Sequence, residues 1–102
     1  MRMLELSLRF KLQFKALAKH PEYRREDFEQ LLDDLIHLEK LPAHYNEHPL
    51  EKRASNYAGD MECHLTGDIV VIYRRMQDVV RLYRIGSHST VFSPRRRSRP
   101  LP

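Results

Sequence analysis

One short run constrains the fold of this chain more than any other feature: residues 69–73 read Ile-Val-Val-Ile-Tyr and are apolar at every position. Successive side chains of a strand point to opposite faces, so a strand of this kind has to be covered on both sides. We therefore expect it to be the central strand of a sheet, within a strand over 68–75. Strands over about 59–65 and 79–85 are predicted as its neighbours, with Gly86 marking the end of the latter.

The first twenty residues combine two signals. Residues 4–14 alternate between apolar and polar side chains, which is typical of a strand, yet the segment also carries apolar residues at helical spacing. Because Ser7 is a good N-cap, we expect a strand to about Leu6 and a helix from Leu8 to Lys19.

A clearer helix is expected from Arg24 to Lys40, ended by Leu41-Pro42. Its apolar stripe consists of Phe28, Leu31, Leu32, Leu35 and Leu38. Residues 42–58 are polar and rich in turn residues, which indicates a long loop with room for one short strand. The order strand, helix, helix and strand meander predicts an α+β fold, with two N-terminal helices packed on a small antiparallel sheet.

Length and composition limit the class of protein. A chain of 102 residues suits one domain, which we expect over residues 1–92. Its longest apolar run is far shorter than the roughly 20 residues of a membrane span, and the N-terminus lacks a signal-peptide pattern. We therefore expect a cytoplasmic protein with no membrane partner. Cys63 is the single cysteine, so no intramolecular disulfide can form.

The net charge of +4 is unevenly placed. Four arginines and three prolines fall within residues 93–102, which have no apolar periodicity and are expected to be a basic disordered tail. Residues 22–39 hold seven acids against two arginines, a balance of −5, so the rest of residues 1–92 carries +5. The sequence therefore predicts a polarised domain with one acidic helix and a basic remainder. For the helix alone, a solvated acidic face is the preferred interpretation.

Three of the six histidines, His48, His64 and His88, lie at loop or strand ends in the C-terminal half. We expect them to share a site, with ordinary surface positions as the alternative. Their spacing matches no short zinc-ligand motif, so no metal is expected. Cys63 and His64 cannot act as a nucleophilic pair, because adjacent residues of a strand point to opposite faces.

Histidines without a metal suit the cleavage of RNA, which carries its own nucleophile in the 2′-hydroxyl group. An imidazole can take up or give a proton near neutral pH. Positive charge must also hold the phosphate, and either Arg81 and Arg84 on a strand or Lys52 and Arg53 in the loop can supply it. A solvated strand face is an equally good interpretation of the two strand arginines.

Three blocks of the sequence together resemble YafQ-like toxins of the RelE/ParE superfamily in their order and spacing. The blocks are Leu41-Pro42 through Glu47-His48-Pro49-Leu50, then Glu62-Cys63-His64 with Gly67-Asp68 and Val71-Ile72-Tyr73, and finally Arg84 through Phe92. The resemblance implies a RelE/ParE-like fold and the toxin of a type II toxin–antitoxin system. It further implies a ribosome-dependent endoribonuclease that cleaves mRNA without a cofactor. A cognate antitoxin would silence it, in a complex that binds operator DNA.

The resemblance also implies particular site residues. Carried over by motif, the family's active-site positions are His48, His64, Asp68, His88 and Phe92. Phe92 would be a stacking surface for a base. Two positions depart from the family's pattern: Met61 stands where an arginine is usual, and Ile69 stands where an aromatic residue often follows the aspartate.

For the cleavage step, we expect His88 to be the general acid and either His64 or Asp68 to be the base. His48 and Arg84 would stabilise the charge of the transition state.

The choice of base depends on the turn before the central strand. A two-residue turn at 66–67 would pair Leu65 with Asp68 and point the Asp68 side chain away from His64. A looser four-residue loop over 65–68 would free Asp68 to turn toward the site, and we favour that form.

Two other functions compete with the nuclease. A ParE-like toxin acts on DNA gyrase by binding and needs no catalytic histidines. A basic nucleic-acid-binding module would use only the arginine tail, and its binding would depend steeply on salt.

Overall fold

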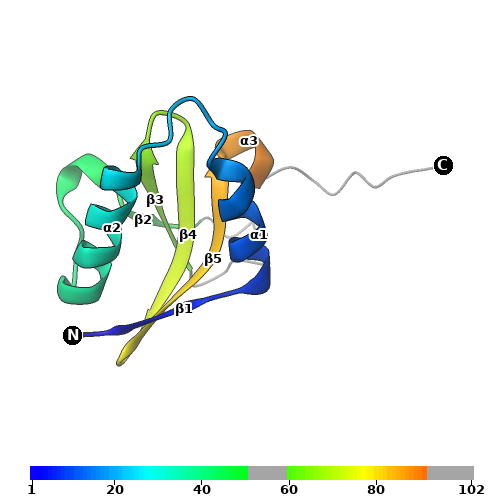
Figure 1. Cartoon of the computed structure of the whole chain (residues 1–102). Helices are drawn as coiled ribbons and strands as arrows, with labels where there is room; N and C mark the ends of the chain where they lie inside the picture. The colour runs from blue at the N-terminus through cyan, green and yellow to red at the C-terminus, as the bar shows by residue number, and fades with distance from the viewer. Residues whose placement is uncertain (51–59, 92–102) are drawn as a thin grey trace.

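The computed structural model describes residues 1–50 and 60–91 (Figure 1). Five strands form one sheet in the order β1-β5-β4-β3-β2. The strands are β1 (Met3–Leu6), β2 (His48–Pro49), β3 (Met61–Thr66), β4 (Ile69–Met76) and β5 (Val79–Ser87). The helices are α1 (Leu8–Leu17), α2 (Arg25–His37), the short α3 (His88–Val91) and a 3-10 turn, η1 (Ala43–Tyr45). This arrangement confirms the predicted α+β fold.

Parts of the prediction fall outside the described residues, namely Lys52, Arg53, Phe92 and the segment 93–102. Within the described residues, no helix is long and apolar enough to cross a membrane.

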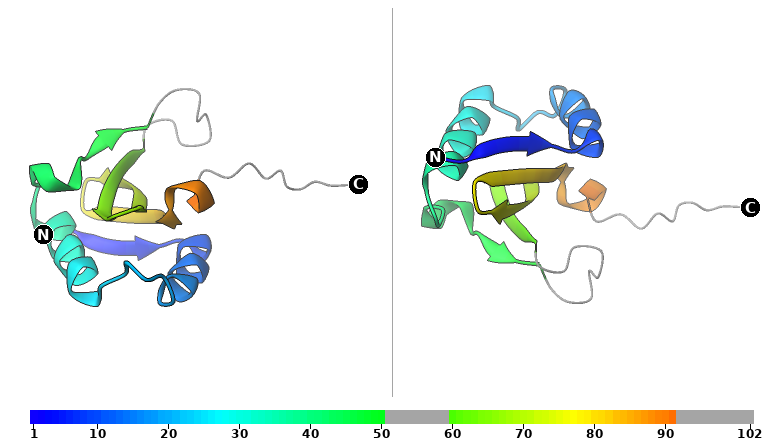
Figure 2. Two further views of the ribbon diagram at one scale, coloured as in Figure 1. Left: turned by 90° about the horizontal axis from the view of Figure 1, so that it is seen from above. Right: turned by 90° about the horizontal axis from the view of Figure 1, so that it is seen from below.

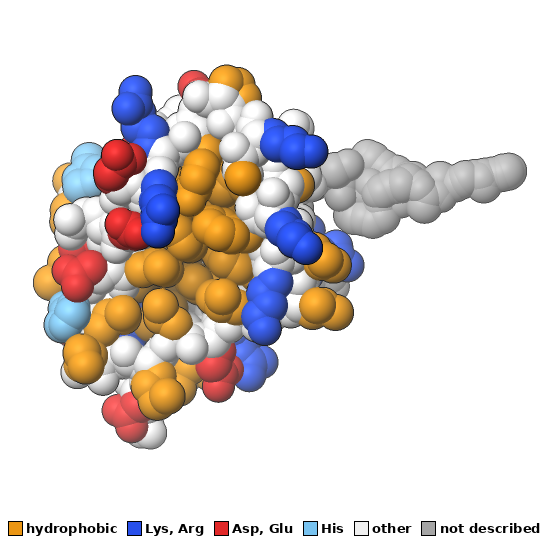
Figure 3. All heavy atoms as spheres, viewed as in Figure 1, with side chains coloured by type: hydrophobic (Ala, Val, Ile, Leu, Met, Phe, Trp, Pro, Cys, Tyr) orange, Lys and Arg blue, Asp and Glu red, His pale blue; other side chains and the backbone are white. Residues whose placement is uncertain are grey.

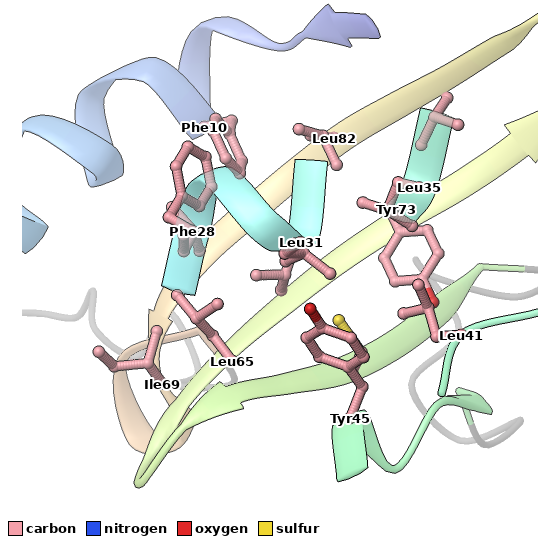
Figure 4. Packing of buried hydrophobic residues seen from close by; sticks show 14 of the residues in the cluster. Phe10, Phe28, Leu31, Leu35, Leu41, Tyr45, Leu65, Ile69, Tyr73 and Leu82 are labelled. Carbon is pink, nitrogen blue, oxygen red and sulfur yellow. The ribbon is translucent and has the colours of Figure 1, made fainter. Parts of the chain in front are cut away.

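β4 is the central strand, as its apolar run predicts. Residues 69–73 are fully buried and divide between the two faces of the sheet. We call the side of the sheet beneath α1 and α2 the helix face. Ile69, Val71 and Tyr73 point to this face and belong to the main core. Val70 and Ile72 form a smaller cluster on the opposite face. Figure 4 shows residues from α1, α2, η1 and the strands converging on the main core.

The two long helices lie on the same side of the sheet (Figure 2). α1 begins at Ser7, whose Oγ accepts a hydrogen bond from the main-chain N–H of Phe10 at 3.0 Å. The Phe14 ring of α1 lies 4.8 Å from the Phe28 ring of α2, and the Phe10 ring lies 6.3 Å from it, measured between centroids. These aromatic contacts join the helices above the sheet.

Both helices end before their predicted limits. α1 ends at Leu17. The N–H of Lys19 donates to the carbonyl of Ala16 at 3.2 Å, three residues back instead of four, which is a tighter turn than that of an α-helix. α2 ends at His37, because Leu38 takes an extended conformation with φ of −107° and ψ of 143°. Leu38 is exposed, so the buried stripe of this helix stops one turn earlier than the pattern indicates.

The sheet is not wholly antiparallel, contrary to our expectation. β1 pairs with β5 in parallel, with Met3 opposite Val79 and Leu6 opposite Leu82. Parallel neighbours need a long connection, and the whole chain between β1 and β5 provides it. The first strand therefore forms an edge of the sheet beside the last one.

The turn between β3 and β4 differs from both forms considered above. Thr66 pairs with Ile69, so the turn residues are Gly67 and Asp68, and Leu65 is an extra residue in the ladder. Gly67 has φ of +52°, in the left-handed region that favours glycine. The favoured loop over 65–68 was wrong, because the register shift at Leu65 lets the strands close with a two-residue turn.

The end of β5 also differs from the prediction, because the strand continues through Gly86 to Ser87 and leads into α3. Val91 of this helix is 1% exposed and packs on Val70 and Ile72. α3 thereby supplies the second cover that the apolar run of β4 requires.

Candidate active site

The face of the sheet opposite α1 and α2, which we call the site face, carries most of the predicted site. On β3, Cys63 and Leu65 belong to the main core, so the alternate residues Glu62 and His64 point to the site face. Arg84 pairs with Ile72, which places it on this face as well. β3 and β5 therefore present polar groups on this side of the sheet, while their other side faces the main core.

A buried carboxylate lies at the centre of this face. Glu62 has a side chain that is 5% exposed, and its Oε1 lies 2.9 Å from Nε2 of His48. Its other oxygen, Oε2, lies 3.8 Å from Nε2 of His88. The two imidazoles are 41% and 57% exposed. One carboxylate thus faces two histidines that are forty residues apart in the chain but remain open to solvent.

The third histidine lies beside the first. The ring centroids of His48 and His64 are 6.5 Å apart. Nδ1 of His64 faces the side-chain amide of Asn46 at 3.4 Å, rather than a carboxylate. The structure therefore brings His48, His64 and His88 together on one face, with different polar neighbours.

Glu62 was missed by the sequence reasoning, although a signal for it was present. It is two residues before His64 in the same strand, so strand alternation places both on one face. A glutamate in a half-buried strand is ordinarily exposed, and only the folded structure shows this one buried between two imidazoles.

The two strand arginines have different surroundings. Nη1 of Arg84 donates to the carbonyl of Val91 at 2.9 Å, which places this half-buried side chain beneath α3. Arg81 lies opposite Arg74, toward the other end of β5, and its Nη2 is 2.7 Å from Oε1 of Glu5. Hydrogen bonding to Glu5 raises the pKa of Arg81. The structure groups Arg84 with the histidines and leaves Arg81 in a separate ion pair.

Asp68 forms hydrogen bonds to Glu22 and His88 through its main chain. Its N–H donates to Oε1 of Glu22 at 3.0 Å, and its carbonyl accepts from the N–H of His88, also at 3.0 Å. The second contact connects the turn to the first residue of α3. Asp68 therefore stands next to the acid candidate in space, with its exposed side chain at the tip of the turn.

The two positions that depart from the family's pattern both pack on the helix face. Ile69 is fully buried in the main core, and Met61 is partly buried against it. Neither side chain adds a cation or an aromatic ring to the site face.

Cys63 is buried on the helix face, as the alternation argument requires. Burial raises the pKa of its thiol, which disfavours the reactive thiolate. In the described part of the chain, no group of three or more His, Cys, Asp or Glu residues has the arrangement of a metal site.

Known proteins share this architecture over nearly the whole chain. A crystal structure of a copper-bound mutant toxin from Helicobacter pylori matches with a TM-score of 0.79 at 26% identity, covering 90% of this chain and 100% of that one. The crystal structure of the Escherichia coli DinJ–YafQ complex matches with a TM-score of 0.78 at 29% identity, covering 91% of this chain and 100% of that one. The fold is therefore that of a bacterial toxin.

Sequence comparison leads to a particular family. The model of the family described as the bacterial toxin of type II toxin–antitoxin system, YafQ, matches residues 2–93. The mRNA interferase toxin YafQ of Escherichia coli strain B / BL21-DE3 is 29% identical over 94 residues, covering 88% of this chain and 99% of that protein. The chain belongs to the YafQ family of type II toxins, as its resemblance to YafQ-like sequences predicted.

Proposed function

We propose that this chain is an mRNA interferase, a ribosome-dependent endoribonuclease that works by acid–base catalysis without a metal. The observation that carries the proposal is the buried carboxylate of Glu62, which faces the exposed imidazoles of His48 and His88. Imidazoles suit RNA cleavage, because a neutral ring can accept a proton and a protonated ring can give one. The nucleophile is the 2′-hydroxyl of the substrate itself. The E. coli relative is itself named as an mRNA interferase.

The polar neighbours of the histidines suggest their roles. His48 and His88 each face the Glu62 carboxylate, which is a suitable ion-pair partner for a protonated ring. A general acid and a group that stabilises negative charge both need that form. His64 faces an amide instead, which suits a neutral ring that can accept a proton.

In the proposed reaction, His64 removes the proton of the 2′-hydroxyl, and the oxygen attacks the neighbouring phosphorus. His88 gives its proton to the 5′-oxygen as the bond from that oxygen to phosphorus breaks. The products are a 2′,3′-cyclic phosphate and a free 5′-hydroxyl. His48 and Arg84 stabilise the charge on the phosphorane, and a preorganised cation of this kind contributes most when the charge develops.

Ribosome dependence and metal independence are tested in one assay of a defined mRNA. We expect cleavage on purified ribosomes and none of the same mRNA when it is free. Activity should persist when EDTA is confined to the toxin stock, so that the ribosomes keep their magnesium. Equally fast cleavage of free mRNA would contradict the ribosome requirement, and loss of activity that a divalent metal restores would contradict a metal-free mechanism.

We further propose that a cognate antitoxin holds this toxin silent in the cytoplasm and that their complex binds operator DNA. The E. coli relative forms a complex with DinJ. Figure 3 shows Lys and Arg side chains over α1, and acidic side chains together with some Lys and Arg on the α2 side. An acidic-to-mixed, disordered antitoxin segment that folds onto the basic side would fit this surface. Its affinity should then fall as salt rises, and affinity independent of salt would contradict the electrostatic part.

A further inference from the structure

The strand that carries His48 has little main-chain support. β2 consists of His48 and Pro49 only and lies at the edge of the sheet. It pairs with β3 through His48 opposite Glu62 and Pro49 opposite Met61. A two-residue edge strand supplies few hydrogen bonds, so the orientation of His48 needs another source.

The residue before it has that support on the other face. Glu47 has a side chain that is 7% exposed, and its Oε2 accepts hydrogen bonds from the Tyr73 hydroxyl and from Nη1 of Arg75, the latter at 2.7 Å. Its Oε1 accepts from the main-chain N–H of Leu41 at 2.8 Å. Tyr73 and Arg75 belong to β4, the most deeply buried strand. We call Glu47, Tyr73 and Arg75 the anchor cluster.

The anchor cluster holds an ionised carboxylate. Burial acts to raise the pKa of Glu47, but the hydrogen bonds from Arg75, Leu41 and Tyr73 outweigh it, and the net pKa is lowered. The Arg75 guanidinium carbon also lies 5.6 Å from the centroid of the Tyr73 ring. Three hydrogen bonds to one charged carboxylate leave the Glu47 side chain little conformational freedom.

We infer that Glu47 is a positioning residue: its hydrogen bonds with Tyr73 and Arg75 on the helix face fix the direction of the His48 imidazole on the site face. The physical basis is chain connectivity: Glu47 directly precedes His48, so holding the Glu47 side chain on the helix face fixes the backbone from which the imidazole projects. Tyr73 and Arg75 act through Glu47 and contact no substrate. The inference rests on the proposed function, in which His48 stabilises the transition state.

The test uses Tyr73→Phe, which keeps the ring that fills the core and removes only the hydroxyl, and Glu47→Gln as a second variant of the same shape. Single-turnover cleavage on ribosomes should slow by about ten- to a hundredfold in either variant, because small misplacements of a catalytic group have effects of that size. The apparent KM should change less than about twofold, because a group that acts only in the transition state does not contribute to substrate binding.

A matched control separates positioning from general loosening. Tyr45 is also a buried tyrosine whose hydroxyl donates to a carboxylate, Asp34 Oδ2, at 2.9 Å, and Asp34 is not part of the anchor cluster. Tyr45→Phe should leave turnover of the folded protein unchanged. If Tyr45→Phe slows cleavage as much as Tyr73→Phe, the effect is unspecific and the inference is overturned.

Coupling to His48 is the decisive readout. In a His48→Ala background, adding Tyr73→Phe should slow cleavage no further, because both changes remove the same contribution. Additive losses would overturn the inference, as would a fully active Tyr73→Phe variant when His48→Ala is impaired. A His48→Ala variant with wild-type turnover would instead refute the role given to His48 in the proposed function, and the positioning role with it.

Discussion

The helix face and the site face of the sheet are built from alternate residues of the same strands, and they differ in what covers them. On β3, Cys63 and Leu65 lie under helices, while Glu62 and His64 point to the opposite face, on which Val91 of α3 and Leu50 pack. The helix face is mainly apolar, with the Glu47–Arg75 ion pair at its margin, whereas the site face combines the buried Glu62 carboxylate with exposed imidazoles. Strand alternation thus separates most of the stabilising core from the side chains proposed for catalysis, so substitutions one residue apart should have different consequences.

The largest difference is expected within the site face, between the two candidates for the base. His64→Ala should slow single-turnover cleavage by at least about a hundredfold, because truncating a base typically costs 10²–10⁴ in rate. Asp68→Asn should cost less than about tenfold, since Asp68 contributes main-chain contacts that asparagine keeps. A large loss for Asp68→Asn with an active His64→Ala variant would reverse the assignment.

The helix face should respond in the opposite way. Leu31 is fully buried in the main core, so Leu31→Ala should lower the free energy of unfolding by about 2–5 kcal/mol. Cleavage per folded molecule should stay the same, because Leu31 does not contact the site face. Leu12→Ala is the control, since Leu12 is 59% exposed and its loss should change stability by no more than about 0.5 kcal/mol. Denaturant titration measures both, and reduced turnover of folded Leu31→Ala would weaken the separation of the faces.

Two arginines of β5 are expected to differ in their contribution to cleavage. Arg84→Ala should slow cleavage by roughly ten- to a hundredfold, in line with the loss of a hydrogen bond to a charged group. Arg81→Ala should have an effect below about twofold, because its exposed ion pair with Glu5 contributes little. Equal effects would indicate that the phosphate spans the whole strand.

The smallest effect is expected outside the described residues. Removing residues 93–102 should change the free energy of unfolding by no more than about 0.5 kcal/mol, as for surface changes away from special features. A larger loss, measured by denaturant titration of the shortened chain, would show that this segment packs on the domain.

Local patterns predicted the order of the longer helices and strands, because alternation and helical periodicity are properties of neighbouring residues. The short α3 was not expected. They separated Cys63 from His64 correctly. The pairing of β1 with β5 and the extra residue at Leu65 could not be derived, because both depend on contacts between distant segments. The same holds for Glu62, because its burial and its proximity to His48 and His88 depend on segments far apart in the sequence.

In the proposed mechanism, exposed histidines of the site face carry out the proton transfers, with His88 as the acid. The most direct measurement is single-turnover cleavage on ribosomes across pH for the wild type and His88→Ala. We expect a bell-shaped profile for the wild type. For the variant, we expect a rate at least about a hundredfold lower, without the falling limb at high pH. His88 is half-exposed, so the variant should fold normally. A folded His88→Ala variant that keeps both limbs and a near wild-type rate would contradict the account.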